Sequence, residues 1–203
     1  MEKIFLDCGT HLCEGILKFH ELGIIDETYK IHAFEANPEC NIVERVKQLP
    51  NEIIPHEVAV WDSDGIIQFR QENHKISNEW YGQKKSPTDG YSDIDGWASS
   101  AADVRLNYPG LDTVIRVESI DFDRFVRELP KVEKIICKFD IEGSEYRVVR
   151  KMIDTGTISR IDELYVEFHQ RFMESETPES TEFLINQLKS LGVYAGDSPR
   201  TYG

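Results

Sequence analysis

The chain contains 203 residues, 40% of them hydrophobic, and its 37 acidic and 23 basic side chains give a formal net charge of −14. This length predicts a single domain over residues 1–203 with one buried core, and the acidic balance argues against a nucleic-acid partner. Four cysteines are too few for a disulfide scaffold, and the sequence shows neither an 18-residue apolar run nor a signal-peptide pattern. A cytoplasmic protein without a membrane span is therefore expected.

Segments with strand and helix patterns alternate along the chain. Strands are expected at residues 3–7, 30–35, 53–61, 113–119, 134–143, 161–169 and 193–196, with 66–70 as a hairpin partner of 53–61. Helices are expected at residues 12–22, 37–49, 119–129, 144–154 and 178–191, the third of them capped by Ser119. This alternation predicts a Rossmann-like α/β fold with a mostly parallel, doubly wound sheet.

Residues 71–112 interrupt this alternation with a long polar insertion. The insertion is rich in Gly, Ser, Asn, Asp and Tyr, and a loop of this length in a compact domain is usually a lid, a binding loop or disordered. It also carries four aromatic residues, Trp80, Tyr81, Tyr91 and Trp97, which disordered segments usually lack. We therefore expect an inserted lid or substrate loop.

The stretch FLDCGTHLCEG at residues 5–15 has the position of a nucleotide-binding loop after the first strand. Its glycines, Gly9 and Gly15, do not make the G-x-G-x-x-G pattern that holds a pyrophosphate, and Asp7 would repel that group. S-Adenosylmethionine instead carries a sulfonium and an ammonium, which suit an acid at this place. Glu35 ends the second strand, where an acid accepts hydrogen bonds from ribose hydroxyls. The residues expected to bind this donor are Asp7, Gly9, Thr10, His11, Glu35, Ala36, Asn37, Val58, Ala59 and Asp140.

A metal is a weaker alternative for the same loop. Cys8, His11 and Cys13 could be read as zinc ligands, but no matching second pair follows at a recurring spacing. The alternative is that Cys8 and Cys13 are small residues packed against the loop.

Several segments together resemble the FkbM-type methyltransferase family over residues 4–169. The resemblance implies a class I methyltransferase fold that uses S-adenosylmethionine, with O-methylation of a hydroxyl on a small molecule, sugar or glycan. Cys13 stands where the family usually has glycine, and the family's N-terminal extension is missing, so we expect the insertion and the C-terminal part to hold the acceptor. The segments that carry the resemblance are FLDCGTHLCEG, IHAFEANP, EVAVWDSDG, ASS, TVIRVESID, KFDIEGSEYRVV and LYVEFH.

Acidic residues and a histidine follow the two late strands, in FDIEGSE and VEFH. Residues two apart share a face, so Asp140 and Glu142 are expected to meet Glu167 and His169 above the sheet, as the catalytic group. Methyl transfer to an alcohol needs help in removing the proton, either from His169 or Glu142 as a base or from Mg²⁺ held by Asp140, Glu167 and His169. Glu145, one turn into a helix, reads as a surface acid that complements the helix dipole.

Two other functions fit parts of this pattern. One is a non-catalytic module that binds S-adenosylmethionine as a sensor or partner subunit, which the unusual Cys13 would allow. The other is an NAD-dependent oxidoreductase, which the first loop disfavours for the reasons given above.

Overall fold

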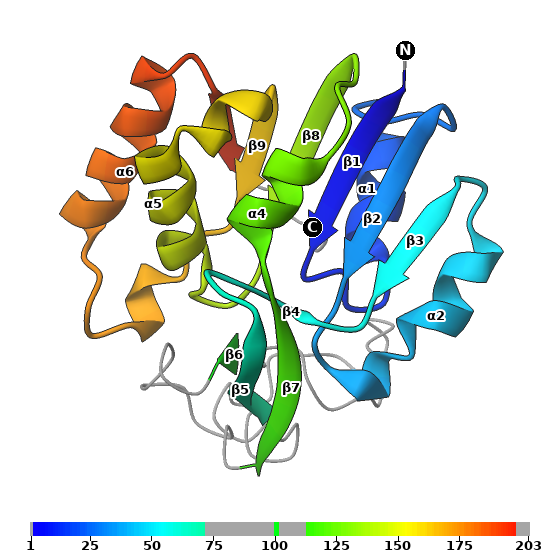
Figure 1. The fold of residues 1–203 in the computed structure, drawn as a ribbon, viewed down its shortest axis with the longest axis horizontal. Helices are drawn as coiled ribbons and strands as arrows, with labels where there is room; N and C mark the ends of the chain where they lie inside the picture. The colour runs from blue at the N-terminus through cyan, green and yellow to red at the C-terminus, as the bar shows by residue number, and fades with distance from the viewer. Residues whose placement is uncertain (1, 72–99, 102–112, 198–203) are drawn as a thin grey trace, which may run out of the picture.

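The computed structural model describes residues 2–71, 100–101 and 113–197. Six strands form a parallel sheet in the order β10-β9-β8-β1-β2-β3 (Figure 1). Their bounds are β1 Lys3–Cys8, β2 Tyr29–Phe34, β3 Ile53–His56, β8 Lys134–Phe139, β9 Glu163–Val166 and β10 Tyr194–Asp197. The expected Rossmann-like α/β fold is confirmed, and the strand order reverses between β1 and β8, where such sheets bind their ligands.

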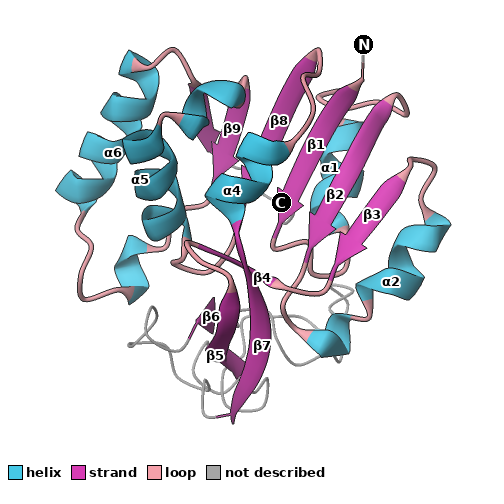
Figure 2. Cartoon of the chain, viewed as in Figure 1, coloured by secondary structure: helices cyan, strands magenta, loops and turns pink. Residues whose placement is uncertain are grey.

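Helices cover both faces of this sheet (Figure 2). The helices are α1 Glu14–Glu21, α2 Ile42–Arg45, α4 Phe122–Glu128, α5 Glu145–Thr155 and α6 Pro178–Ser190, with short 3₁₀ helices η1 Pro38–Cys40, η2 Val46–Gln48, η3 Thr157–Arg160 and η4 Gln170–Phe172. Side chains alternate along β1: Leu6 packs with residues of α4, α5 and α6, whereas Phe5 packs with Ile16 and Phe19 of α1. The sheet is therefore wound on both faces, as expected.

A second sheet lies beyond the carboxyl ends of the first (Figure 1). Its order is β4-β7-β5-β6, with β4 Ala59–Trp61, β5 Gly65–Gln71, β6 Ser100–Ala101 and β7 Thr113–Asp121. The expected strand 53–61 is thus divided between two sheets. Residues 66–70 were expected to pair with it as a hairpin, and this expectation is wrong. β5 pairs with β7 in antiparallel fashion, and β7 lies between β5 and β4.

Two expected helices differ in the structure. The helix at 37–49 is divided into η1, α2 and η2, because Asn41 adopts a left-handed conformation at φ 47° between the first two. The helix at 119–129 begins only at Phe122, and Asp121 caps it by accepting a hydrogen bond from the Arg124 amide. Ser119 remains in β7 and donates to the Ser63 carbonyl, so its expected capping role is wrong.

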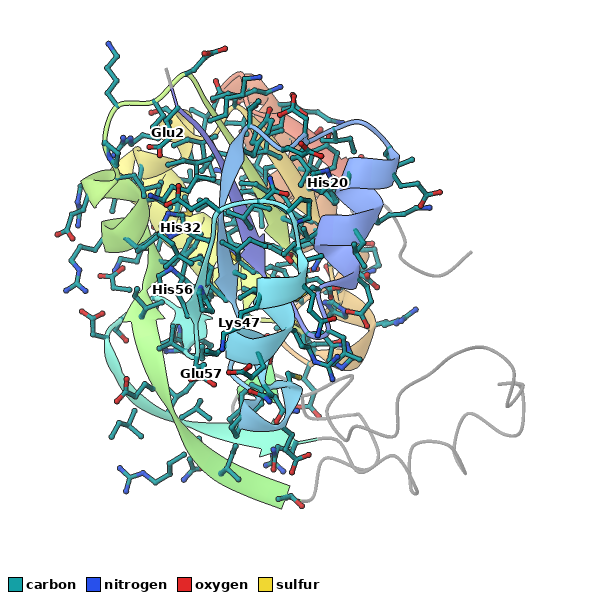
Figure 3. All side chains as sticks on the ribbon, turned by 90° about the vertical axis from the view of Figure 1, so that its right-hand side faces the viewer. Glu2, His20, His32, Lys47, His56 and Glu57 are labelled. Atoms are coloured by element: carbon teal, nitrogen blue, oxygen red, sulfur yellow. The ribbon has the colours of Figure 1, made fainter. Side chains whose placement is uncertain are left out.

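Two histidines lie side by side on β2 and β3 (Figure 3). Nδ1 of His32 is 3.0 Å from Nε2 of His56, and the His56 ring stacks on Phe34 at a centroid distance of 4.4 Å. Both rings also contact Phe125 in α4 in T-shaped arrangements. The two histidines are therefore part of the contact between the sheet edge and α4.

The expected lid at 71–112 lies outside the described residues, except for Gln71 and the strand β6. In the described parts of the chain, no helix has the length and apolar character needed to cross a membrane.

Candidate active site

The loop after β1 lies directly against the loop after β8. Gly9 has φ 78°, and a Cβ atom added to it would lie 1.9 Å from the Asp140 carbonyl oxygen. Glycine is therefore required here both by conformation and by space. The contact joins the two loops at the point where the strand order reverses.

A buried ion pair lies beneath these loops. Nζ of Lys138 is 3.2 Å from Oδ1 of Asp7, 3.0 Å from the Gly9 carbonyl oxygen and 3.6 Å from Oδ2 of Asp140. Burial alone would lower the pKa of Lys138, but the charges of Asp7 and Asp140 raise it above its ordinary value. Thr10 donates its hydroxyl to the Asp7 carboxylate at 2.9 Å. Asp7 thus has its partners within the protein.

The sequence analysis did not identify Lys138 as a site residue. A lysine inside an apolar strand is unusual, and this is the signal that could have identified it.

The second glycine of the first loop, Gly15, is explained by this ion pair. A Cβ atom at Gly15 would lie 3.1 Å from the Lys138 side chain and 3.3 Å from Oδ1 of Asp7. Gly15 therefore lets the first turn of α1 rest on the ion pair.

Glu35 joins the loop after β1 to the loop after β2. Its carboxylate accepts hydrogen bonds from the backbone amides of His11 at 2.8 Å and Asn37 at 2.7 Å. Burial raises the pKa of Glu35 above its ordinary value, against the lowering effect of these two hydrogen bonds. The acid at the end of β2 therefore fixes the relative position of the two loops.

The remaining residues expected around a donor lie beside this loop pair. Ala36 packs against a small apolar cluster that contains Ala59, and Val58 packs against the core of the first sheet. Asn37 is buried and caps η1, accepting from the Glu39 amide at 3.1 Å. The side-chain oxygen of Asn37 therefore stabilises the start of η1.

The cysteines and His11 do not form a zinc site. Cys8 packs on the face of the sheet that α4 and α5 cover, whereas Cys13 packs on the opposite face with α1. Cys13 has φ 72° and ψ 17°, a left-handed conformation that favours glycine. The loop therefore keeps a glycine-like backbone at the position where cysteine replaces that residue.

Three carboxylates lie around Nε2 of the His169 imidazole, beyond the ends of β8 and β9. Nε2 of His169 is 3.4 Å from Oε2 of Glu142, 3.8 Å from Oδ1 of Asp140 and 3.8 Å from Oε1 of Glu167. The expected convergence of these four residues is present, although they lie in loops after the strands and not in the strands themselves. His169 is only 4% exposed, whereas Glu167 is 46% exposed.

Glu145 was read as a surface acid, and this interpretation is wrong. Its side chain is fully buried and accepts hydrogen bonds from the Gly143 amide at 2.8 Å and the His169 amide at 2.9 Å. The same carboxylate is 3.0 Å from Nδ1 of His169. Glu145 therefore fixes the His169 ring against the start of α5, through contacts that the helix pattern alone does not reveal.

The group that could hold a metal differs in one member from the expected Asp140, Glu167 and His169. In the described residues, single ligand atoms of Asp140, Glu142 and His169 all lie within 4.8 Å of one another, and Glu167 is not part of this group. The φ of Glu142 is 56°, a left-handed value that is rare for a residue other than glycine.

A cavity of about 530 Å³ borders the site at Gly143, beside α5 and the segment that precedes α6. Its lining includes Tyr146 and three cations, each with an acidic partner. The pairs are Arg147 with Asp62 at 2.6 Å, Arg150 with Glu176 at 2.5 Å, and Lys151 with Asp121 at 2.8 Å. The cations that line the cavity are therefore balanced by acidic partners.

The chain matches a known protein family. A sequence model described as the methyltransferase FkbM domain matches residues 7–193, a span that contains all of the candidate site residues. No curated protein and no solved structure matched the chain.

Proposed function

Because the chain belongs to the FkbM methyltransferase family, we propose that it transfers a methyl group from S-adenosylmethionine to a hydroxyl oxygen of a small molecule, sugar or glycan. The observation that carries this proposal is the contact of the first loop with the late acidic loop, through Gly9 and the Asp140 carbonyl. This contact supports a donor and an acceptor held next to each other at one edge of the sheet.

The donor part of the proposal assigns the loops after β1 and β2 to S-adenosylmethionine. When bound, this cofactor supplies a methyl group on a positively charged sulfur. Glu35 supports the ribose end, because its carboxylate already fixes the backbone of both loops. Asp7 acts as a positioning residue, since it is fully buried and paired with Lys138. The other proposed contacts are Gly9, Thr10, His11, Ala36, Asn37, Val58, Ala59 and Asp140.

The acceptor part of the proposal assigns the cluster around His169 to the hydroxyl group. In the reaction an O–CH₃ bond forms, the S–CH₃ bond breaks, and the hydroxyl proton passes to the cluster. Asp140, Glu142, Glu167 and His169 together offer several places for that proton beside the contact between the loops. In-line displacement then depends mainly on holding donor and acceptor collinear.

The cavity beside α5, whose charged side chains are paired, supports an uncharged acceptor that carries hydroxyl groups. Its ion-paired side chains offer fixed hydrogen-bond donors and acceptors without a net charge that would select an anion or a cation. Such a lining suits a sugar or another polyol.

The non-catalytic alternative rested on Cys13, which stands where the family usually has glycine. Its backbone is glycine-like, and the residues of the late cluster lie close together. We therefore do not retain it as a second candidate.

The proposed chemistry is tested by following label from methyl-labelled S-adenosylmethionine into matched sets of alcohols, amines and thiols. We expect transfer to hydroxyl compounds, sugars included, with Asp140→Asn at least 100-fold slower because the cluster loses a carboxylate beside Gly9. Circular dichroism controls for folding of the variant. Label found on nitrogen or sulfur alone would contradict the O-methyltransferase assignment.

A further inference from the structure

One imidazole nitrogen and two carboxylates face one another at the ends of β8 and β9. From this arrangement we propose that Asp140, Glu142 and His169 bind one divalent transition-metal ion of the Mn²⁺ or Fe²⁺ type. The inference rests on the proposed function only for the role of the ion, because the binding site itself is defined by the three side chains.

The separations of the ligand atoms suit a shared ion. Ligands about 2.1 Å from one metal, at tetrahedral or octahedral angles, lie about 3.0–3.5 Å from each other. Nε2 of His169 is 3.4 Å from Oε2 of Glu142 and 3.8 Å from Oδ1 of Asp140. Small side-chain rotations of the two carboxylates therefore bring all three ligands to bonding distance.

Glu145 prepares the imidazole for this role. When Nδ1 of His169 carries the proton, it donates to the Glu145 carboxylate across their contact of 3.0 Å. In the neutral ring the lone pair is then on Nε2, which faces Glu142 and Asp140. A carboxylate behind a histidine is a common arrangement around protein-bound metals, where it fixes the ring and its tautomer.

The backbone at Glu142 is consistent with a functional constraint. Glu142 has φ 56° and Gly143 has φ 105°, so two successive residues have positive values. This conformation is unfavourable for a glutamate, and such strain is found mainly where a site requires it. Here the turn holds the Glu142 carboxylate against His169.

The donor set favours a transition metal over Mg²⁺. Mg²⁺ prefers oxygen ligands and retains several waters, whereas Mn²⁺, Fe²⁺ and Zn²⁺ accept both imidazole nitrogen and carboxylate oxygen. The nearby Lys138 does not replace such an ion, because it is held by Asp7 and the Gly9 carbonyl as well as by Asp140. In the described residues this group offers one imidazole nitrogen and two carboxylate oxygens, a donor set that such an ion accepts.

The ion would face the acceptor and polarise its hydroxyl group, which lowers the free energy needed to remove the proton. With His169 and Glu142 bound to the ion, the proton passes to Glu167. That carboxylate is 3.8 Å from Nε2 of His169 and half exposed to solvent. The O–H and S–CH₃ bonds would break as the O–CH₃ bond forms, the sulfur keeping the electron pair and becoming neutral.

Binding is measured by electron paramagnetic resonance, in which the signal of free Mn²⁺ disappears when the ion binds. The full chain, treated with EDTA and desalted, is titrated with Mn²⁺ alone. We expect one site of micromolar affinity, from which Mg²⁺ displaces Mn²⁺ only in more than tenfold excess. His169→Ala should weaken Mn²⁺ binding at least 10-fold, Glu145→Gln by 10- to 100-fold, and the exposed control Glu174→Gln not at all.

Glu142→Gly separates binding from folding. Glycine adopts a positive φ without a steric penalty, so this variant should be at least as stable as the wild type. Because it lacks the carboxylate ligand, it should bind Mn²⁺ at least 10-fold more weakly. Absence of Mn²⁺ binding, or binding equal in wild type and His169→Ala, would overturn the proposal. Calorimetry with S-adenosylhomocysteine on the same samples reports on the donor site, so failure of the metal site is distinguished from failure of the proposed function.

Discussion

Cys13 shows how a single residue can depart from a family pattern without changing the loop. Its φ of 72° is the conformation that a glycine would adopt, and its side chain fills a buried place beside α1. A non-glycine residue in the left-handed region is less stable by about 1–2 kcal/mol. The cysteine therefore combines an unfavourable backbone with a favourable packing contact.

Cys13→Gly and Cys13→Ala separate these two effects. Both variants lose the buried sulfur, but only glycine adopts the left-handed conformation without a steric penalty. Cys13→Gly should therefore be more stable than Cys13→Ala by about 1 kcal/mol. Urea unfolding of the two variants measures the difference. If the alanine variant were the more stable one, the left-handed conformation at this position would be wrong.

Lys138 and Asp7 form a buried ion pair beneath the loops. Lys138→Met should destabilise the fold by about 3–5 kcal/mol, because it leaves the fully buried Asp7 carboxylate without its cation. Adding Asp7→Asn removes that charge and should recover part of the loss. Chemical denaturation of both variants tests this; a double variant no more stable than Lys138→Met would show that Asp7 does not depend on the lysine.

At the scale of elements, the strands β2 and β3 carry a titratable contact with α4. Burial and the neighbouring charge of His56 lower the pKa of His32 to about 4, with Lys30 adding to the lowering and Glu52 opposing it. Burial also lowers the pKa of His56. Both rings are therefore neutral at pH 7, and one N–H between them serves the contact of 3.0 Å.

This contact predicts loss of stability in acid. The folded-state pKa of His32 lies below its unfolded value, so between about pH 6.5 and pH 4 the unfolded chain binds more protons. The free energy of unfolding therefore falls as the pH is lowered through this range. The contribution of His32 to this loss in the free energy of unfolding approaches about 3 kcal/mol near pH 4. Replacing both histidines with glutamine should reduce this dependence, measured by urea unfolding across that range. Equal slopes in variant and wild type would exclude the pair as its source.

Elements with complete local patterns could be predicted from the sequence, and those decided by distant partners could not. The apolar run of β8 and the stop of α5 at Gly156 are local signals. The division of residues 53–61 depends on β7, which pairs with β4 from more than fifty residues away. A hairpin pattern in the sequence identifies only neighbouring strands, so it could not identify β7 as the partner of β4 and β5.

The same distinction holds for the candidate site. Asp140 and His169 follow apolar strands, so their convergence was predictable from parallel pairing. Glu145 looked like an exposed helix acid because its partners, Gly143 and His169, are determined by how the loops fold over α5. Lys138 was missed for a related reason, since its acidic partner Asp7 belongs to another strand.

At the scale of the whole molecule, the order β10-β9-β8-β1-β2-β3 places the two candidate halves of the site at one edge. Loops after β1 and β2 form the proposed donor half, and loops after β8 and β9 form the proposed acceptor half. The second sheet lies beyond that same edge (Figure 1). The arrangement therefore concentrates acidic side chains where a cationic methyl donor is expected.

Isothermal titration calorimetry of the full chain with S-adenosylmethionine, S-adenosylhomocysteine and NAD tests the central claim most directly. We expect both sulfur nucleosides to bind with micromolar affinity and NAD not to bind. Glu35→Gln should weaken nucleoside binding at least 10-fold, whereas the exposed control Glu182→Gln on α6 should leave it unchanged. Binding of NAD without binding of either sulfur nucleoside would contradict the assignment of these loops to a methyl donor.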